Sequence, residues 1–226
     1  MGIILLAYLP ALIGMFIIAL FVFARQKKPM HIAFAATLFA VVIWLAAQLT
    51  SFFVSIDVAL WATRFSLLAF NFITPAFFVF TLLYPGAKSW LSLKTLLLVC
   101  AVPLVFTPFS LFPDMVKSVE RQGGDLILRT GFLYDAQTAI AIFYIVAALI
   151  VLAVKYRRET RKDRVAILML FVAFLFPLVV GFLANYLWIS IPGTQYLLPI
   201  TLFITFLIIA YAMIKHRLFD LSLIHI

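Results

Sequence analysis

The sequence predicts an all-α integral membrane protein, a bundle of seven transmembrane helices. Of its 226 residues, 67% are hydrophobic and only 11% are charged, which lies far outside the range of soluble globular proteins. Apolar stretches of about 19 to 25 residues recur along the chain, and each is long enough to cross ~30 Å of hydrocarbon as a helix. None of them shows the alternating polarity of a membrane β-strand.

Short connections separate most of these stretches, so helices that are consecutive in the chain should pack as neighbours. The remaining residues are spread over loops and ends, which leaves no room for a second domain. We therefore expect residues 1–220 to form one seven-transmembrane domain. The seven expected spans are residues 3–23, 30–53, 60–84, 92–111, 136–154, 165–187 and 196–214.

The first span has the apolar character of a signal peptide. It lacks a basic start, however, and no small-residue cleavage site precedes the basic residues Arg25 to Lys28 that end it. We interpret 3–23 as a true span. The only cysteine, Cys100, falls inside the fourth span, so an intrachain disulfide is excluded.

The basic residues predict the orientation of the chain. Most of the 17 Lys and Arg residues lie in the connections after the first, third and fifth spans and after the last span. Short basic loops stay in the cytoplasm, so the N-terminus is expected outside and the C-terminus in the cytoplasm. The net charge of +9 is then a topology signal that also suits anionic lipid headgroups, and it does not indicate nucleic-acid binding.

The longest connection, residues 112–135, is expected on the outer side. Its runs VKSVERQ and DLILRT flank Gly123-Gly124, a dipeptide that suits a tight hairpin turn. A small β-hairpin over the outer mouth of the bundle, with Val116, Val119, Leu126, Ile127 and Leu128 supplying its apolar residues, is one interpretation; an irregular loop is the other.

The connection before the sixth span, KYRRETRKDR, mixes six basic with two acidic residues. The plain interpretation is that helix ends run into solvated headgroup contacts. The sharper one is a docking surface for a cytoplasmic partner domain.

Polar residues inside the expected spans gather in the outer halves. Because polar side chains in hydrocarbon are costly and usually face the bundle interior or water, this asymmetry predicts a cavity that opens outward. The expected ligand-binding residues are Gln48, Arg64, Asn71, Gln137, Asn185, Tyr186 and Gln195.

Arg64 is open to two interpretations. It lies about one turn inside the third span, and Asn71 follows seven residues later on the same face. Arg64 either extends to the headgroups or pairs with Asp57, or it anchors an anionic ligand group with Asn71, Gln137 and Asn185 as hydrogen-bonding partners.

Prolines interrupt the expected spans at Pro75, Pro103, Pro108 and Pro177. Each removes a backbone hydrogen bond and can kink its helix. These positions are either points where a helix bends on ligand binding or ordinary membrane-helix prolines, which are commoner there than in soluble helices.

The sequence lacks catalytic chemistry. His31, His216 and His225 have no companions at metal-ligand spacing, the spans contain no paired carboxylates, and no serine lies in a nucleophile elbow. The seventh span carries no central lysine for a retinal Schiff base. We expect no enzyme activity in this chain, no metal and no cofactor.

The chain resembles the seven-transmembrane N-terminal sensor region of bacterial histidine kinases, which also precedes diguanylate cyclases. The most specific mark is YAMIKHRLFDL (Tyr211 to Leu221); weaker marks are Trp61 with Arg64, Pro75-Ala76-Phe77, GFLY (Gly131 to Tyr134), the basic run before the sixth span, and Pro177 with Asn185.

The resemblance implies a multi-pass protein of the bacterial inner membrane and a homodimer, with a kinase or cyclase output domain following in the same full-length chain. The signal would leave through Lys215, His216, Arg217, Leu218, Phe219 and Asp220. The tail, residues 221–226, reads LSLIHI, which is similar to translated sequencing adapter, so it is either native or a non-native end of a truncated fragment.

We therefore expect a receptor domain that binds a small or lipid-borne ligand from the outside or the outer leaflet. A small transporter or channel would need polar lining through the inner half and internal repeats, and neither is visible. A structural membrane subunit is the third possibility.

Overall fold

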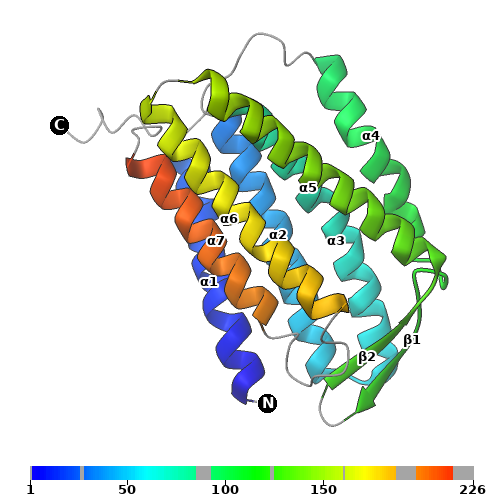
Figure 1. Ribbon diagram of the computed structural model, residues 1–226. Coiled ribbons are helices and arrows are strands. Elements are labelled where there is room, and N and C mark those ends of the chain that lie inside the picture. The colour runs from blue at the N-terminus through cyan, green and yellow to red at the C-terminus, as the bar shows by residue number, and fades with distance from the viewer. Residues whose placement is uncertain are drawn as a thin grey trace.

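The computed structural model describes residues 2–25, 28–84, 93–122, 125–159, 161–186 and 197–215. These residues form seven helices and two strands, in chain order α1–α4, β1, β2 and α5–α7 (Figure 1). Their bounds are α1 Gly2–Arg25, α2 Pro29–Phe53, α3 Ile56–Leu83, α4 Leu93–Phe109, β1 Val116–Gln122, β2 Asp125–Thr130, α5 Phe132–Arg158, α6 Arg161–Tyr186 and α7 Leu197–Lys215.

Six of these helices form a closed ring. Around the ring the order is α1, α2, α3, α5, α6 and α7, and α7 packs against α1 to close it. Helix α4 lies outside this ring and packs against α3 (Figure 1). The expectation that consecutive helices are neighbours holds for most pairs. It is incomplete for α5, which packs chiefly against α3 and α6.

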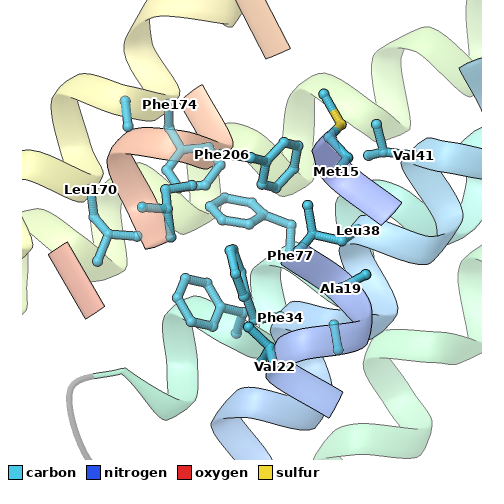
Figure 2. Close-up of a cluster of buried hydrophobic side chains, with 14 of the residues drawn as sticks. Met15, Ala19, Val22, Phe34, Leu38, Val41, Phe77, Leu170, Phe174 and Phe206 are labelled. Atoms are coloured by element: carbon cyan, nitrogen blue, oxygen red, sulfur yellow. The ribbon is translucent and has the colours of Figure 1, made fainter. Parts of the chain in front are cut away.

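An apolar core fills the interior of the ring. Its fully buried side chains include Met15 of α1, Phe34 of α2, Phe80 of α3, Leu170 of α6 and Ile209 of α7. Figure 2 shows the middle of this cluster, where aromatic rings from several helices meet. The ring of Phe34 lies 5.3 Å from that of Phe80 and 6.0 Å from that of Phe206, between centroids.

Five of the described helical segments are long and apolar enough to cross a membrane: Gly2–Ala24, Pro29–Phe53, Ile56–Leu83, Phe132–Arg158 and Asp163–Val180. Helices α4 and α7 contain shorter apolar segments, Leu98–Phe109 and Leu197–Met213. Many large apolar side chains on the outside of the bundle are exposed, as expected of helices that face lipid.

Of the two interpretations of residues 112–135, a β-hairpin and an irregular loop, the hairpin is confirmed. Strands β1 and β2 pair antiparallel, with Val119 opposite Leu128 and Arg121 opposite Leu126, and a bulge lies between Val116 and Ser118. The turn at Gly123-Gly124 lies outside the described residues.

The hairpin packs on the first turns of α3 through a second apolar cluster. Val116 and Val119 are buried there with Ala59, and Leu126 and Leu128 are partly buried beside them. Ile127 belongs to the hairpin but lies on its other face and is 41% exposed, because side chains alternate between the two faces of a strand and Leu126 and Leu128 take the packed face.

Candidate functional site between helices α3, α4 and α5

A hydrogen-bonded polar cluster joins three helical segments in the half of the bundle nearer the hairpin. The side-chain amide of Gln137 in α5 donates through Nε2 to Oδ1 of Asn71 in α3 (2.6 Å) and to the backbone carbonyl of Leu67 (2.9 Å). Nδ2 of Asn71 donates to the hydroxyl of Ser110, just after α4 (2.8 Å). Asn71, Gln137 and Ser110 are all buried. Asn71 and Gln137, both expected among the ligand-binding residues, are thus hydrogen-bonded to each other.

A small cavity lies next to this cluster, with about 10 Å³ of space for the centre of a water-sized molecule. That is room for about one water. None of the described residues that line it is charged, and its walls come from α3, α4 and α5. The lining residues are Phe70, Asn71, Thr74, Pro103, Phe106, Gln137, Ile140, Ala141 and Tyr144.

Of the predicted binding residues whose side chains the structure describes, Asn71 and Gln137 line this cavity, and Gln48 and Arg64 do not. Sequence reasoning missed Thr74 and Tyr144. Helical spacing could have found both, because Thr74 follows Asn71 by three residues and Tyr144 follows Gln137 by seven, which places each pair on one helix face.

Gln48 takes part in a separate polar contact between α2 and α3. Its Nε2 donates to the hydroxyl of Ser66 (3.1 Å), and Ser66 donates in turn to the carbonyl of Thr63 in its own helix (2.7 Å). Gln48 therefore fastens α2 to α3 and does not line the cavity.

Arg64 fastens the hairpin to α3. Its guanidinium is buried, donates through Nη2 to the carbonyl of Val116 (2.8 Å) and lies over the ring of Trp61 at 5.1 Å. No ion pair joins Arg64 to Asp57 within the described residues, and Asp57 is exposed. The interpretation as an arginine that pairs with Asp57 was therefore wrong, because the guanidinium bonds the carbonyl of Val116 in β1 instead. Its extension to the headgroups stays a prediction. Arg64 also does not line the cavity.

A second arginine holds the other side of the hairpin. Arg121 in β1 donates to the backbone carbonyls of Ser51 (3.3 Å), Phe52 (3.2 Å) and Val54 at the end of α2. Carbonyls at the end of a helix lack helical partners, and a cation there also meets the negative end of the helix dipole. The position of the hairpin is thus tied to both α2 and α3.

Two of the proline interruptions are compensated by hydroxyl groups from neighbouring helices. A proline leaves the carbonyl four residues before it without its helical hydrogen bond. Pro103 frees the carbonyl of Val99, which accepts from the hydroxyl of Tyr144 in α5 (2.5 Å). Pro177 frees the carbonyl of Ala173, which accepts from the hydroxyl of Thr205 in α7 (3.0 Å).

Lys155 is buried at the opposite end of the bundle, although the sequence placed it in a solvated connection. Helix α5 continues to Arg158, and Nζ of Lys155 donates to the carbonyls of Thr81 (2.9 Å), Leu82 (2.7 Å) and Tyr84 at the end of α3. For Lys155 the headgroup interpretation was therefore wrong.

The remaining predicted residues cannot be located in this site. Asn185 and Tyr186 fall in the last turn of α6, where side chains are outside the described part of the structure, and Gln195 lies outside it altogether. Of the expected output segment, Lys215 ends α7, and residues 216–220 lie outside the described residues.

Comparison with known proteins places these features in a family. No curated protein matches the chain. Residues 7–222 match the family described as the N-terminal 7TM region of histidine kinase, which agrees with the seven helices, and this region is a non-catalytic membrane input domain. The chain therefore belongs to the family of N-terminal seven-transmembrane regions of histidine kinases.

Proposed function

We propose that this chain is a receptor domain that detects a small ligand at the cavity between α3, α4 and α5 and passes the change through α7 to a cytoplasmic output domain. The observation that carries the proposal is the buried network of Asn71, Gln137 and Ser110 beside that cavity. Polar groups in a membrane interior are costly and usually face the bundle interior or water, and the family is that of kinase sensor regions.

The proposed orientation has the N-terminus and the hairpin outside and the end of α7 in the cytoplasm. It is supported by the basic last turn of α5, with Lys155, Arg157 and Arg158, because basic segments stay inside. The start of α1 and the end of α7 lie at opposite ends of the bundle (Figure 1), as an odd number of crossings requires.

The apolar core supports a receptor over a channel or transporter. The interior of the ring near Phe34, Phe80 and Met213 is filled by fully buried apolar side chains. A channel would need a polar or wettable path through this region.

Helix α7 is the proposed route of the signal, because it is joined to the rest of the bundle at defined points. Thr205 bonds the carbonyl of Ala173 in α6. Gly14 of α1 lies so close to the ring of Phe203 in α7 that a Cβ at this glycine would overlap the ring. A shift of α5 and α6 on ligand binding would thus move α7, and with it the segment Lys215 to Asp220. In the full-length protein that segment would lead to a kinase or cyclase domain within a homodimer of the bacterial inner membrane.

Orientation can be tested by cysteine labelling in intact cells, with Cys100→Ser as the background. Lys117→Cys in the hairpin and Arg157→Cys at the end of α5 are both at exposed positions. A membrane-impermeant maleimide should label the first in intact cells and the second only after permeabilisation. The reverse pattern would overturn the proposed orientation.

The sensing role can be tested by joining residues 1–220 to the cytoplasmic part of a reporter histidine kinase and measuring phosphotransfer. Asn71→Leu and Gln137→Leu should change the basal output or its response to membrane-soluble compounds. The matched control is Thr50→Leu, because Thr50 is exposed and bonds only the carbonyl of Ala46 in its own helix. If kinase output responds to no stimulus and is unchanged in both cavity variants, the proposal is wrong.

A further inference from the structure

We infer that the cavity between α3, α4 and α5 takes a small neutral molecule that carries one O–H or N–H donor on an apolar or aromatic body. This inference rests on the proposed sensing function and deepens it by naming the chemical class of the ligand.

The need for a donor comes from Gln137. Both hydrogens of its amide nitrogen are used, one by Asn71 and one by the carbonyl of Leu67. Its oxygen Oε1 is buried and has no hydrogen-bond partner among the described residues, and the side chain is 3% exposed. A flipped amide would set that oxygen against the carbonyl of Leu67, so the orientation is fixed. A buried acceptor without a partner is costly, and a ligand that donates to it relieves this cost.

The requirement for a neutral ligand follows from the cavity walls. Among the described residues they contain no Lys, Arg, Asp or Glu, so a charged group would lose its hydration without gaining a counterion. Phe70, Phe106, Pro103 and Ile140 also line the cavity. Aromatic and aliphatic surfaces of this kind favour an apolar or aromatic ligand body.

Helix α4 is the element that would move to admit such a ligand, because the present cavity has room for about one water. Helix α4 stands outside the six-helix ring, and its Leu98 and Val105 are 74% and 61% exposed. At Pro103 the helix lacks one of its own backbone hydrogen bonds, and the carbonyl of Val99 is held by Tyr144 instead. Bending α4 outward at this point would break one interhelical bond and open the cavity toward the lipid.

Three ligands of similar size test the donor requirement on the full chain in lipid nanodiscs. They are 4-fluorobenzyl alcohol, which has a donor, 4-fluorobenzyl methyl ether, which has only an acceptor, and 4-fluorotoluene, which has neither. Fluorine NMR line broadening, measured against empty nanodiscs to subtract partition into lipid, reports binding to the protein. The alcohol should bind roughly tenfold more tightly than the other two, as one buried hydrogen bond allows.

Two variants of α5 test the location. Ala141→Phe fills the cavity, since Ala141 is 5% exposed and lines it, and should abolish protein-dependent binding of the alcohol. Ala139→Phe adds the same side chain at an exposed position of the same helix and should leave binding unchanged. The inference is wrong if the unmodified chain binds all three ligands equally, or if Ala141→Phe binds the alcohol as well as the unmodified chain does. It is also wrong if no ligand shows protein-dependent binding, in which case the cavity is a site for water only.

Failure of this inference is distinguishable from failure of the sensing proposal. Donor-dependent binding without any change in reporter-kinase output would overturn the sensing role and keep the site. A reporter response that depends on Asn71 and Gln137 but shows no preference for donor ligands would keep the sensing role and overturn the ligand class.

Discussion

The hydroxyl of Thr205 in α7 donates a hydrogen bond to the backbone carbonyl of Ala173 in α6, at a distance of 3.0 Å. That carbonyl is the one that Pro177 deprives of its helical partner. The same arrangement joins Tyr144 of α5 to the carbonyl of Val99, four residues before Pro103 in α4. In a membrane, a freed carbonyl must find another donor, so each proline creates a specific attachment point for a neighbouring helix.

Replacing Thr205 by valine keeps the shape of the side chain and removes the donor. We expect the free energy of unfolding to fall by about 0.6 kcal/mol, the average measured for interhelical hydrogen bonds in a membrane protein, and by no more than about 1.7 kcal/mol, the largest value. The measurement is reversible unfolding by SDS in mixed micelles. Thr201→Val is the control, because Thr201 is also buried in α7 but bonds the carbonyl of Leu198 in its own helix. Equal losses in both variants would show that the contact between α6 and α7 adds nothing specific.

Gly131, between β2 and α5, allows the backbone of Asp114, just before β1, to approach closely. A Cβ at this position would overlap the carbonyl oxygen of Asp114 and approach the side chain of Lys117 at 3.1 Å. Gly131→Ala should therefore shift the hairpin and destabilise the protein by about 1–3 kcal/mol, the usual cost of overpacking. Gly2→Ala is the control, because nothing lies within 4 Å of a Cβ there. Amide exchange in β1 and β2 measures the effect, and an unchanged hairpin in Gly131→Ala would contradict this account.

The secondary structure followed closely from sequence patterns, but the helix ends and helix rotations did not. The runs on either side of Gly123-Gly124 became β1 and β2, because turn chemistry and alternating residues are local signals. The fifth span was predicted as 136–154, whereas α5 runs from Phe132 to Arg158. Apolar composition predicts the part of a helix that lies in hydrocarbon. It does not predict the polar turns that extend the helix at either end.

The candidate site was predicted in part for a related reason. Depth in the membrane can be read from position along a span, so Asn71 and Gln137 were found. Which polar side chains meet each other depends on how each helix is rotated, and nearly uniform apolar helices carry little information on rotation. The partners of Arg64 and Gln48 therefore became visible only in the structure.

Lys155 should stabilise the protein at the end of the bundle away from the hairpin. Its ammonium group is buried against the last carbonyls of α3, where a cation also favours the helix dipole. Lys155→Met preserves the alkyl chain and removes the donors, and it should lower the free energy of unfolding by about 1.5–3 kcal/mol. Arg157→Met, at an exposed position of the same helix, should cost little. If both variants unfold alike in SDS titrations, Lys155 does not stabilise the end of α3.

Replacing Arg64 distinguishes a structural role of this residue from a role in ligand binding. If its purpose is to hold the carbonyl of Val116, Arg64→Leu should release the hairpin and raise amide exchange in β1 and β2 about tenfold or more, as loss of a hydrogen bond to a charged donor implies. Arg129→Leu is the control, because Arg129 is exposed on β2 and pairs with the exposed Glu120. Hairpin exchange that stays unchanged in Arg64→Leu, together with an altered ligand response of the reporter kinase, would return Arg64 to the role of a direct ligand anchor.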